Sequence, residues 1–357
     1  MAHAIGQMFY YGDKPWHEFG EKLSGPANLE QALKAGGLDW EVNLVPLAAV
    51  DDPKAVIPQR MAVVREDRAP GQAGRVIGVV HPDFIPLQNR KGAELFDALL
   101  AKGQALYHTG GYLKNGERIW LMAQLPQYQI QVGKNDRVEP YLLFSNSHDG
   151  SQAIDIRLTT IRVVCQNTLS MALRNKATST FFRRSHNDRY DKLKIEAAEF
   201  FAFLKTEIDE TQKLFTQLDE RQCADEAFQR FLEKLLPVPK QPVTAKPHSS
   251  ILKAHESRVA SVKEARQGIQ NVREQGVPMS RMNRRNAELF VAEYGNEVAA
   301  IPPDRKTWWG ALNSVTAWVD HCQNIKTDRY AHIMFGSGDT LKSRALGLVQ
   351  EASKQDA

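Results

Sequence analysis

Short apolar runs, many with every second position hydrophobic, alternate with glycine- and proline-rich breaks over the first 160 residues. This pattern is typical of β-strands, several of them paired as hairpins. Strands are expected at 40–50, 60–67, 74–80, 104–113, 118–127, 141–145 and 153–160. The break APGQAG at 69–74 predicts a hairpin between the strands at 60–67 and 74–80, and a tight turn at Asp149-Gly150 supports pairing of the last two strands. Between the strands the pattern predicts two helices, at 29–37 and 89–103, each ending at a glycine.

In the second half of the chain the spacing of apolar residues becomes helical. Residues 162–177 are predicted to pass from the end of a strand into a helix, with Asn167 or Thr168 as its N-cap. Apolar residues from about 188 to 236 predict a long amphipathic helix, either in one piece or broken near Asp219. Further helices are expected at 250–272, 284–295, 306–324 and 340–354. In the helix at 306–324, one apolar face favours a helix–helix core; it consists of Trp308, Ala311, Leu312, Val315 and Val319.

These elements predict an α+β fold. We expect an N-terminal mixed domain with antiparallel β-hairpins and helices, followed by a mainly α-helical C-terminal region. Four prolines between residues 237 and 250 indicate a linker or an exposed loop. The predicted division is an α+β domain at 1–187, a long amphipathic helical segment at 188–236, the linker at 237–250 and a helical region at 251–357.

Composition narrows the class of protein but does not give its activity. The chain has 357 residues, of which 42% are hydrophobic and 25% charged, as in an ordinary globular protein of about two domains. No apolar stretch approaches the roughly 18 residues of a membrane span, and we expect no signal peptide. The three cysteines, Cys165, Cys223 and Cys322, lie far apart in the sequence. Their spacing argues against a disulfide framework or a cysteine-rich zinc site, and favours the reducing cytoplasm.

The search for catalytic motifs finds nothing above background. Residues 336–345, GSGDTLKSRA, are similar to a phosphate-binding loop, but that motif needs glycine before Lys342 and Leu341 stands there. A helix start capped by Asp339 or Thr340 is the better explanation. There is neither a dinucleotide-binding GxGxxG after a strand nor an HExxH motif. We therefore expect no cofactor and no resident metal, and an enzyme is the less favoured class.

Single residues that could carry chemistry also have simpler explanations. His148-Asp149 precedes a glycine, and a turn that needs Asp-Gly is favoured over a pair of metal ligands. Trp16-His17 is interpreted as packing and capping rather than as a functional contact. Cys165 follows two valines, and we interpret it as a buried small hydrophobic residue rather than a nucleophile.

Positive charge is concentrated in one part of the chain. The net charge is +4, but residues 157–192 contain eight basic residues against two acidic ones, Asp188 and Asp191. A basic stripe on an otherwise near-neutral chain is typical of a protein that binds a polyanion. The alternative is a solvated surface with scattered positive charges. The eight basic residues are Arg157, Arg162, Arg174, Lys176, Arg183, Arg184, Arg189 and Lys192.

Aromatic residues are interleaved with these charges. Phe181, Phe182 and Tyr190 stand beside arginines, and hydroxyl and amide side chains between 159 and 170 can donate hydrogen bonds to phosphate oxygens. Cations that follow the backbone, together with aromatic rings that stack on bases, are typical of sequence-neutral binding to single strands. The two phenylalanines fit a hydrophobic core equally well, so both interpretations stay open.

Several blocks of sequence resemble a known family. They are PWHEFG at 15–20, PLQN at 86–89, YLLFSNSHDGSQA at 141–153, RVVCQNTL at 162–169, WWGALNSVTAWVDH at 308–321 and FGSGDTLKSRAL at 335–346. In this order they are similar to the phage/plasmid-like proteins of domain-of-unknown-function family 932 (DUF932), and the resemblance runs from about residue 14 to about residue 350. It implies a setting of phages, plasmids and integrated elements. It supplies no catalytic residues.

Our leading hypothesis is a nucleic-acid-binding protein, with single-stranded DNA favoured. It would act in annealing, recombination or DNA maintenance without nucleotide hydrolysis, and would form homo-oligomers through its helical parts. The eight basic residues would hold phosphates, and Lys114 and Arg118 would extend the same track from a neighbouring hairpin. One alternative is a protein-interaction or anti-defence module that binds a host protein through its helical half. A third is a metal-dependent nuclease whose site is assembled from distant His, Asp and Glu residues.

Overall fold

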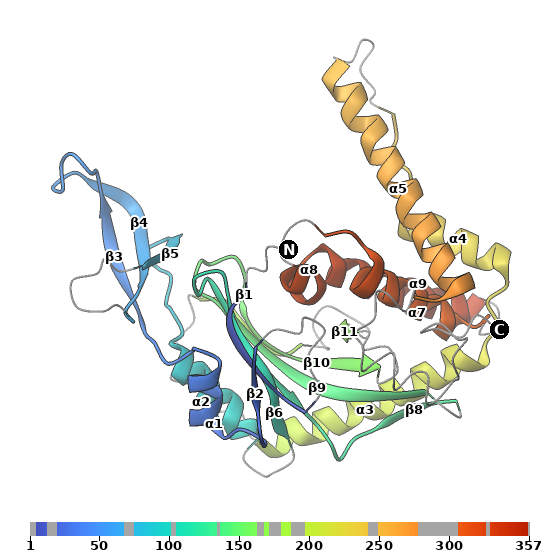
Figure 1. Ribbon diagram of the computed structural model, residues 1–357, viewed down its shortest axis with the longest axis horizontal. Coiled ribbons are helices and arrows are strands. Elements are labelled where there is room, and N and C mark those ends of the chain that lie inside the picture. The colour runs from blue at the N-terminus through green and yellow to red at the C-terminus, as the bar shows by residue number, and fades with distance from the viewer. Residues whose placement is uncertain are drawn as a thin grey trace. The chain divides into compact units, whose positions relative to one another are not determined.

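The computed structural model describes residues 5–12, 20–67, 75–100, 105–133, 136–162, 168–170, 180–186, 197–241, 249–277, 306–325 and 329–355. The chain divides into two compact units, each assembled from three segments. Unit 1 consists of Met1–Gln129, Glu139–Thr159 and Asn175–Ile208, and unit 2 of Ile130–Val138, Thr160–Arg174 and Asp209–Ala357. The predicted α+β class is confirmed: antiparallel hairpins fill the N-terminal half and helices most of the C-terminal half (Figure 1). The predicted domain boundaries stay predictions.

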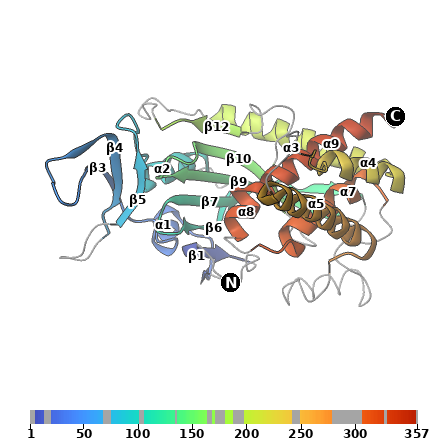
Figure 2. The same cartoon turned by 90° about the horizontal axis from the view of Figure 1, so that it is seen from above.

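The larger of two sheets has the strand order β11-β10-β9-β7-β6-β1-β2, with β12 paired to β10 and β8 to β9. Figure 2 shows β6, β7, β9 and β10 side by side. Strands β1 and β2 are parallel, whereas β6, β7 and β9 form antiparallel pairs. The strands are β1 (Ile5–Tyr11), β2 (Glu21–Leu23), β6 (Leu106–Leu113), β7 (Arg118–Gln124), β8 (Ile130–Val132), β9 (Asp136–Ser147), β10 (Ile154–Arg162), β11 (Thr168–Ser170) and β12 (Thr180–Arg184).

The middle of this sheet is buried on both faces. Residues 119–123 of β7 are all fully buried, as a continuous apolar run predicts for a covered strand. In unit 1 the ring of Phe96, on helix α2 (Asn89–Leu100), stacks on Phe144 of β9 with 5.9 Å between centroids. Helix α1 (Leu29–Ala35) begins with a capping box, in which Asn28 and Gln31 exchange hydrogen bonds between side chain and backbone. A local sequence signal therefore sets the start of α1.

A second, three-stranded sheet has the order β3-β4-β5 and lies within unit 1. It comprises β3 (Val42–Ala48), β4 (Val56–Arg65) and β5 (Arg75–Val80), and the predicted β4–β5 hairpin is confirmed by their antiparallel pairing. Arg65 is buried, stacks over the rings of Trp40 and Tyr112, and donates a 2.9 Å hydrogen bond to the Asn115 carbonyl. This arginine therefore ties the small sheet to the β6–β7 turn.

Unit 2 surrounds one fully buried helix. All ten residues of α7 (Trp308–Ala317) are buried, so the predicted apolar face is confirmed and the opposite face is covered as well. Its last turn continues as a π-helix, η3 (Trp318–Cys322). The other helices are α3 (Ala197–Glu220), which unit 2 shares with unit 1, α4 (Asp225–Leu235), α5 (Ser249–Gln275), α8 (Arg329–Phe335) and α9 (Ser337–Gln355). Among the described residues, none of the helices is long and apolar enough to cross a membrane.

From residue 197 on, where the structure describes it, the amphipathic region 188–236 contains two helices, because α3 ends at Glu220 and α4 starts at Asp225. The backbone between them bonds to the start of α7 instead of continuing a helix. Cys223 N–H donates to the Lys306 carbonyl at 2.7 Å, and Trp308 N–H donates to the Arg221 carbonyl at 3.0 Å. The break near Asp219 was thus the correct alternative, and tertiary hydrogen bonds account for it.

Two predicted helix starts are wrong. Thr168 lies in strand β11, so it does not cap a helix; Asn167 lies outside the described residues. Helix α9 starts at Ser337, so Asp339 and Thr340 lie in its first turn instead of capping it, and the Thr340 hydroxyl donates to the Gly336 carbonyl at 3.1 Å. The predicted helix at 284–295 also lies outside the described residues.

Gly111→Ala is expected to lower the free energy of unfolding by about 1–3 kcal/mol. Gly111 is paired with Met8 of β1, and a Cβ at position 111 would overlap the Gln7 carbonyl oxygen and lie 2.7 Å from Met8 Cβ. Urea unfolding measures the change. The control is Gly347→Ala in α9. A Cβ added there would have no neighbouring atom within 4 Å, and the free energy of unfolding should rise by about 0.5–1 kcal/mol because alanine favours the helix. Equal stability of Gly111→Ala and the wild type would contradict the close approach of the strands.

Candidate nucleic-acid interface

The strand register brings three distant segments to one end of the larger sheet. Arg118, the first residue of β7, pairs with both Leu113 of β6 and Ser147, the last residue of β9. Arg184, the last residue of β12, pairs with Ile154, the first residue of β10. Residues 114–117, 148–153 and 183–186 therefore meet at the same sheet end, which we call the turn end.

Four of the ten predicted phosphate-binding residues lie at the turn end. Lys114 forms an ion pair with Glu117, and Arg118 donates a 3.1 Å hydrogen bond to the Ser151 hydroxyl. Arg183 and Arg184 are both exposed at the end of β12. Because successive residues of a strand point to opposite faces, these two arginines present charge on both sides of it. The sheet thus gathers cations that are about 70 residues apart in the sequence.

The other predicted residues are not brought there within the described part of the chain. Arg157 is only 16% exposed, and its Nε lies 3.7 Å from Asp155 Oδ1. Asp155 is in turn the partner of Arg183 across the β10–β12 pair, so a carboxylate separates the two arginines. Arg162 is the last residue of β10. Outside the described residues lie Arg174, Lys176, Arg189, Lys192 and the aromatic Tyr190.

A cavity of about 730 Å³ opens at the turn end, entirely within unit 1. Its wall includes Phe84, whose ring stacks on the imidazole of His186 with 4.4 Å between centroids and 21° between planes. His186 Nε2 lies 3.1 Å from the Gln152 carbonyl, and the His186 carbonyl accepts a hydrogen bond from Ile85 N–H. Arg183 also lines the cavity, which places a guanidinium beside two stacked rings.

The charged residues that line the cavity are more negative than positive. Asp83 and Asp149 line it together with Arg183. Burial lowers the pKa of His186, although hydrogen bonds to the Ile85 and Gln152 carbonyls oppose the shift, so the ring is neutral at pH 7. Attraction for a polyanion therefore has to come from the arginines at the rim rather than from the cavity itself.

Next to the cavity, His148 is fully buried. The predicted turn is confirmed: Gly150 has φ +72°, and Asp149 Oδ1 accepts the Ser151 N–H at 3.0 Å. The His148 Nε2 lies 2.8 Å from Asn89 Oδ1, and burial lowers the pKa of its imidazole to about 3. Close packing supports this turn, because a Cβ at Gly78 would lie 2.6 Å from Asp149 Cα.

Sequence reasoning missed the aromatic stack. His186 stands only three residues after Arg183, yet it was given no role, and Phe84 is about 100 residues away from it in the chain. The pairing depends on the packing of the small sheet against the turn end, for which no spacing in the sequence gives a signal. The signal in the sequence that could have indicated a role for His186 is its position two to three residues after the arginine pair.

A metal-dependent nuclease needs a cluster of metal ligands, and nucleotide hydrolysis of the common kind needs a phosphate-binding loop. Among the described residues, no group of three or more His, Cys, Asp or Glu side chains is placed to hold a metal ion. Residues 336–345, compared above with a phosphate-binding loop, follow helix α8 and from Ser337 on belong to helix α9, so they do not follow a core strand. This placement supports the decision against a P-loop.

Comparisons with known proteins give a family and nothing closer. No curated protein matches the chain, and no solved structure matches it either. One family model, described as "Domain of unknown function (DUF932)", matches residues 76–341, which is well over half of the chain. The matched region includes the turn end of unit 1 and most of the helices of unit 2. The chain therefore belongs to the DUF932 family.

Proposed function

We propose that this protein binds nucleic acid, with single-stranded DNA as the favoured ligand, and that the turn end is its binding surface. The observation that carries the proposal is the exposed pair Arg183 and Arg184 beside a cavity walled by the Phe84–His186 stack. Arg118 and Lys114 lie at the same sheet end. Exposed arginines next to aromatic surface combine the two contacts that single-strand binding needs, one to phosphate and one to a base.

In this mechanism the rim arginines hold phosphates and an unpaired base enters the cavity. A guanidinium donates to two phosphate oxygens at once, which orients the backbone. Phe84 and the neutral ring of His186 are only 9% and 6% exposed, and this small exposed part forms the cavity wall against which any base would pack, so binding is insensitive to sequence. No step requires nucleotide hydrolysis. We place this activity in the cytoplasm, in annealing or maintenance of phage- or plasmid-type DNA, by a protein that forms homo-oligomers.

Arg183→Glu/Arg184→Glu is expected to weaken binding to a labelled single-stranded oligonucleotide by at least about tenfold near 0.1 M salt. Fluorescence anisotropy at several sodium chloride concentrations measures the affinity. Each phosphate contact contributes about 0.7 to the log–log salt slope for single strands, so losing two contacts lowers the slope by about 1.4. A duplex of the same sequence, titrated in parallel, tests the preference for single strands.

The matched control is Arg258→Glu/Lys263→Glu on α5, which changes the net charge by the same amount at two exposed positions of unit 2. Its affinity should stay close to that of the wild type. Equal losses in the two double variants would mean that net charge, and not the turn end, governs binding. Absence of binding by the wild type even at low salt would refute the proposal.

One observation favours the alternative of a protein partner. The small sheet exposes several large apolar side chains, among them Val45 at 44%, Val76 at 55% and Val79 at 52%. Exposed apolar clusters of this kind mark protein interaction sites. Val45 does not line the turn-end cavity, so Val45→Asp would leave affinity for the oligonucleotide intact and abolish binding to such a partner, which separates the two functions.

A further inference from the structure

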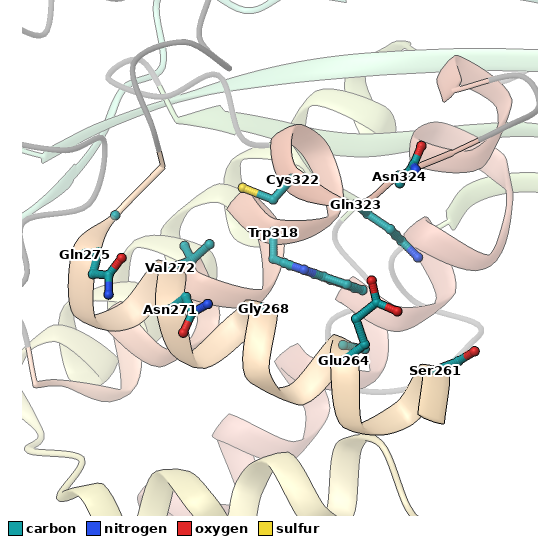
Figure 3. Close-up of a pocket in the computed structure, with 12 residues that line it drawn as sticks. Ser261, Glu264, Gly268, Asn271, Val272, Gln275, Trp318, Cys322, Gln323 and Asn324 are labelled. Atoms are coloured by element: carbon teal, nitrogen blue, oxygen red, sulfur yellow. The ribbon is translucent and has the colours of Figure 1, made fainter. Parts of the chain in front are cut away.

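A second cavity lies entirely within unit 2, between helix α5 and the π-helix η3, and its volume is about 670 Å³ (Figure 3). We call it the α5–η3 groove. Its size is in the range of small-molecule sites. Its polar lining consists mainly of amides, and Glu264 is the one charged residue among its lining residues. The side chains used below are Glu264, Asn271, Trp318 and Gln323.

The π-helix η3 forms one wall of the groove, and a wide-turn hydrogen bond and a buried ion pair fix its geometry. The Gln323 N–H donates to the Trp318 carbonyl at 2.7 Å, which is the wide i→i−5 turn of a π-helix. Within this turn the carboxylate of Asp320 accepts a 2.8 Å bond from Lys342, and both side chains are almost completely buried. A buried ion pair contributes little net stability, whereas it does fix geometry. Single π-turns of this kind occur often at functional sites.

On the opposite wall, helix α5 has a glycine where the indole ring of Trp318 packs against it. Gly268 of α5 faces Trp318, and a Cβ at this position would overlap the indole Nε1 and lie 2.9 Å from Cδ1. The glycine therefore lets the indole approach the helix backbone. Trp318 is only partly buried, so part of its ring surface remains available to a ligand in the groove (Figure 3).

The orientation of two amides follows from their partners. Gln267 Nε2 donates to Asn271 Oδ1 at 2.8 Å, and His332 Nε2 lies 2.9 Å from Gln323 Oε1. Burial lowers the pKa of His332, so the ring is neutral and carries one proton. Because Gln323 Oε1 can only accept, the single ring proton lies on Nε2, and Nδ1, which is 3.1 Å from Ser337 Oγ, is the acceptor.

Both amides thus have an occupied oxygen and an NH₂ group for a ligand, and Glu264 supplies an acceptor. The groove therefore combines two donors, one acceptor and a tryptophan face, with no cation among its lining residues. A nucleobase has the matching chemistry: ring nitrogens and carbonyls accept, an exocyclic amine or ring N–H donates, and the planar ring stacks on indole. We propose that the α5–η3 groove binds the base of an uncharged nucleoside. The absence of lining cations separates it from a phosphate site.

The test is isothermal titration calorimetry of the full chain with adenosine, cytidine, guanosine and uridine. Saturable binding of at least one nucleoside with a dissociation constant below about 1 mM is expected. Trp318→Leu and Gln323→Leu should each weaken it by about tenfold or more, because they remove the stacking surface and a donor. The matched control is Gln217→Leu, an exposed amide on α3 of unit 2, which should bind like the wild type.

Three further measurements test the proposal even if one of these variants fails to fold. Photocrosslinking of wild-type protein with the nucleoside 4-thiouridine should label peptides containing residues 261–275 or 318–324, and labelling elsewhere only would overturn the proposal. Binding of D-ribose as tight as that of the nucleosides would identify a sugar site and refute the proposed base site. Absence of saturable binding for all four nucleosides would refute the proposal as well. Arg183→Glu/Arg184→Glu should leave nucleoside binding intact, so failure here and failure of the turn-end proposal are distinguishable.

Discussion

Lys342→Met is expected to lower the free energy of unfolding by about 3–5 kcal/mol. The Lys342 ammonium lies 2.8 Å from Asp320 Oδ1, with the two side chains 1% and 2% exposed. Methionine fills most of the same space but leaves the carboxylate buried without its cation. Returning that carboxylate to water requires opening the contact between η3 and α9, and unfolding does so. Urea unfolding followed by circular dichroism measures the loss.

The double variant Asp320→Asn/Lys342→Met separates charge from packing. Asparagine removes the buried negative charge and keeps hydrogen-bonding groups at the position, so much of the lost stability should return. If the double variant were as unstable as Lys342→Met, packing of the lysine stem would be the cause. If Lys342→Met were as stable as the wild type, the pair would not be buried as described.

Acid is expected to destabilise unit 1 through His148, by about 4–5 kcal/mol in total between pH 6.5 and pH 3. In the unfolded chain this histidine takes up a proton near pH 6.5, whereas burial lowers the pKa of the folded imidazole to about 3. Between these values the unfolded state binds more protons, so stability falls as pH falls, by about 1.4 kcal/mol per pH unit. Above pH 6.5 both states are neutral at this site, and the contribution does not change.

The hydrogen bonds explain why protonation is resisted. The Asn89 NH₂ donates to the Leu38 and Trp40 carbonyls, so its Oδ1 is the acceptor and the proton of His148 sits on Nε2. A second proton would go to Nδ1, which has no hydrogen-bond partner among the described residues and is buried. The nearby charge of Arg65 opposes it as well, and Asp149 only partly compensates.

His148→Gln is the variant that checks this. Glutamine can keep an N–H donor toward Asn89 but cannot take up a proton, so urea unfolding from pH 7 to pH 4 should show a shallower fall in stability than the wild type. Part of the slope will persist, because burial also lowers the pKa of His186. An unchanged slope in His148→Gln would assign the acid sensitivity to other groups.

Local patterns predicted most of the elements of this fold. The β4–β5 hairpin, the capped helix α1 and the apolar face around Trp308 each depend on spacing within about 20 residues, and the structure confirms them. Thr168 shows the limit. Its segment has the sequence pattern of a helix start, but in the structure it forms strand β11, which pairs with β10 in the sheet. This pairing involves another part of the chain, so the local sequence does not predict it.

The candidate site was predictable only in part, for a related reason. A run of basic residues in the sequence is not a basic surface, because strand pairing decides which side chains share a face. Pairing placed Asp155 opposite Arg183 and brought Arg118 to the same sheet end as Arg184. The stack of His186 on Phe84 joins residues from the segments that follow β12 and β5, and it could not be predicted from either segment alone.

The division of each unit into three chain segments has a consequence for synthesis on the ribosome. Asp136 is completely buried in the finished protein, and its carboxylate accepts a 2.8 Å hydrogen bond from the indole of Trp309, 173 residues later in the chain. At about 5–20 residues per second, that partner is made roughly 10–30 s after the aspartate. During this interval the Asp136 carboxylate at the start of β9 has no indole partner and stays hydrated. Unit 2 therefore cannot close during translation before Trp309 has been made and has left the ribosome.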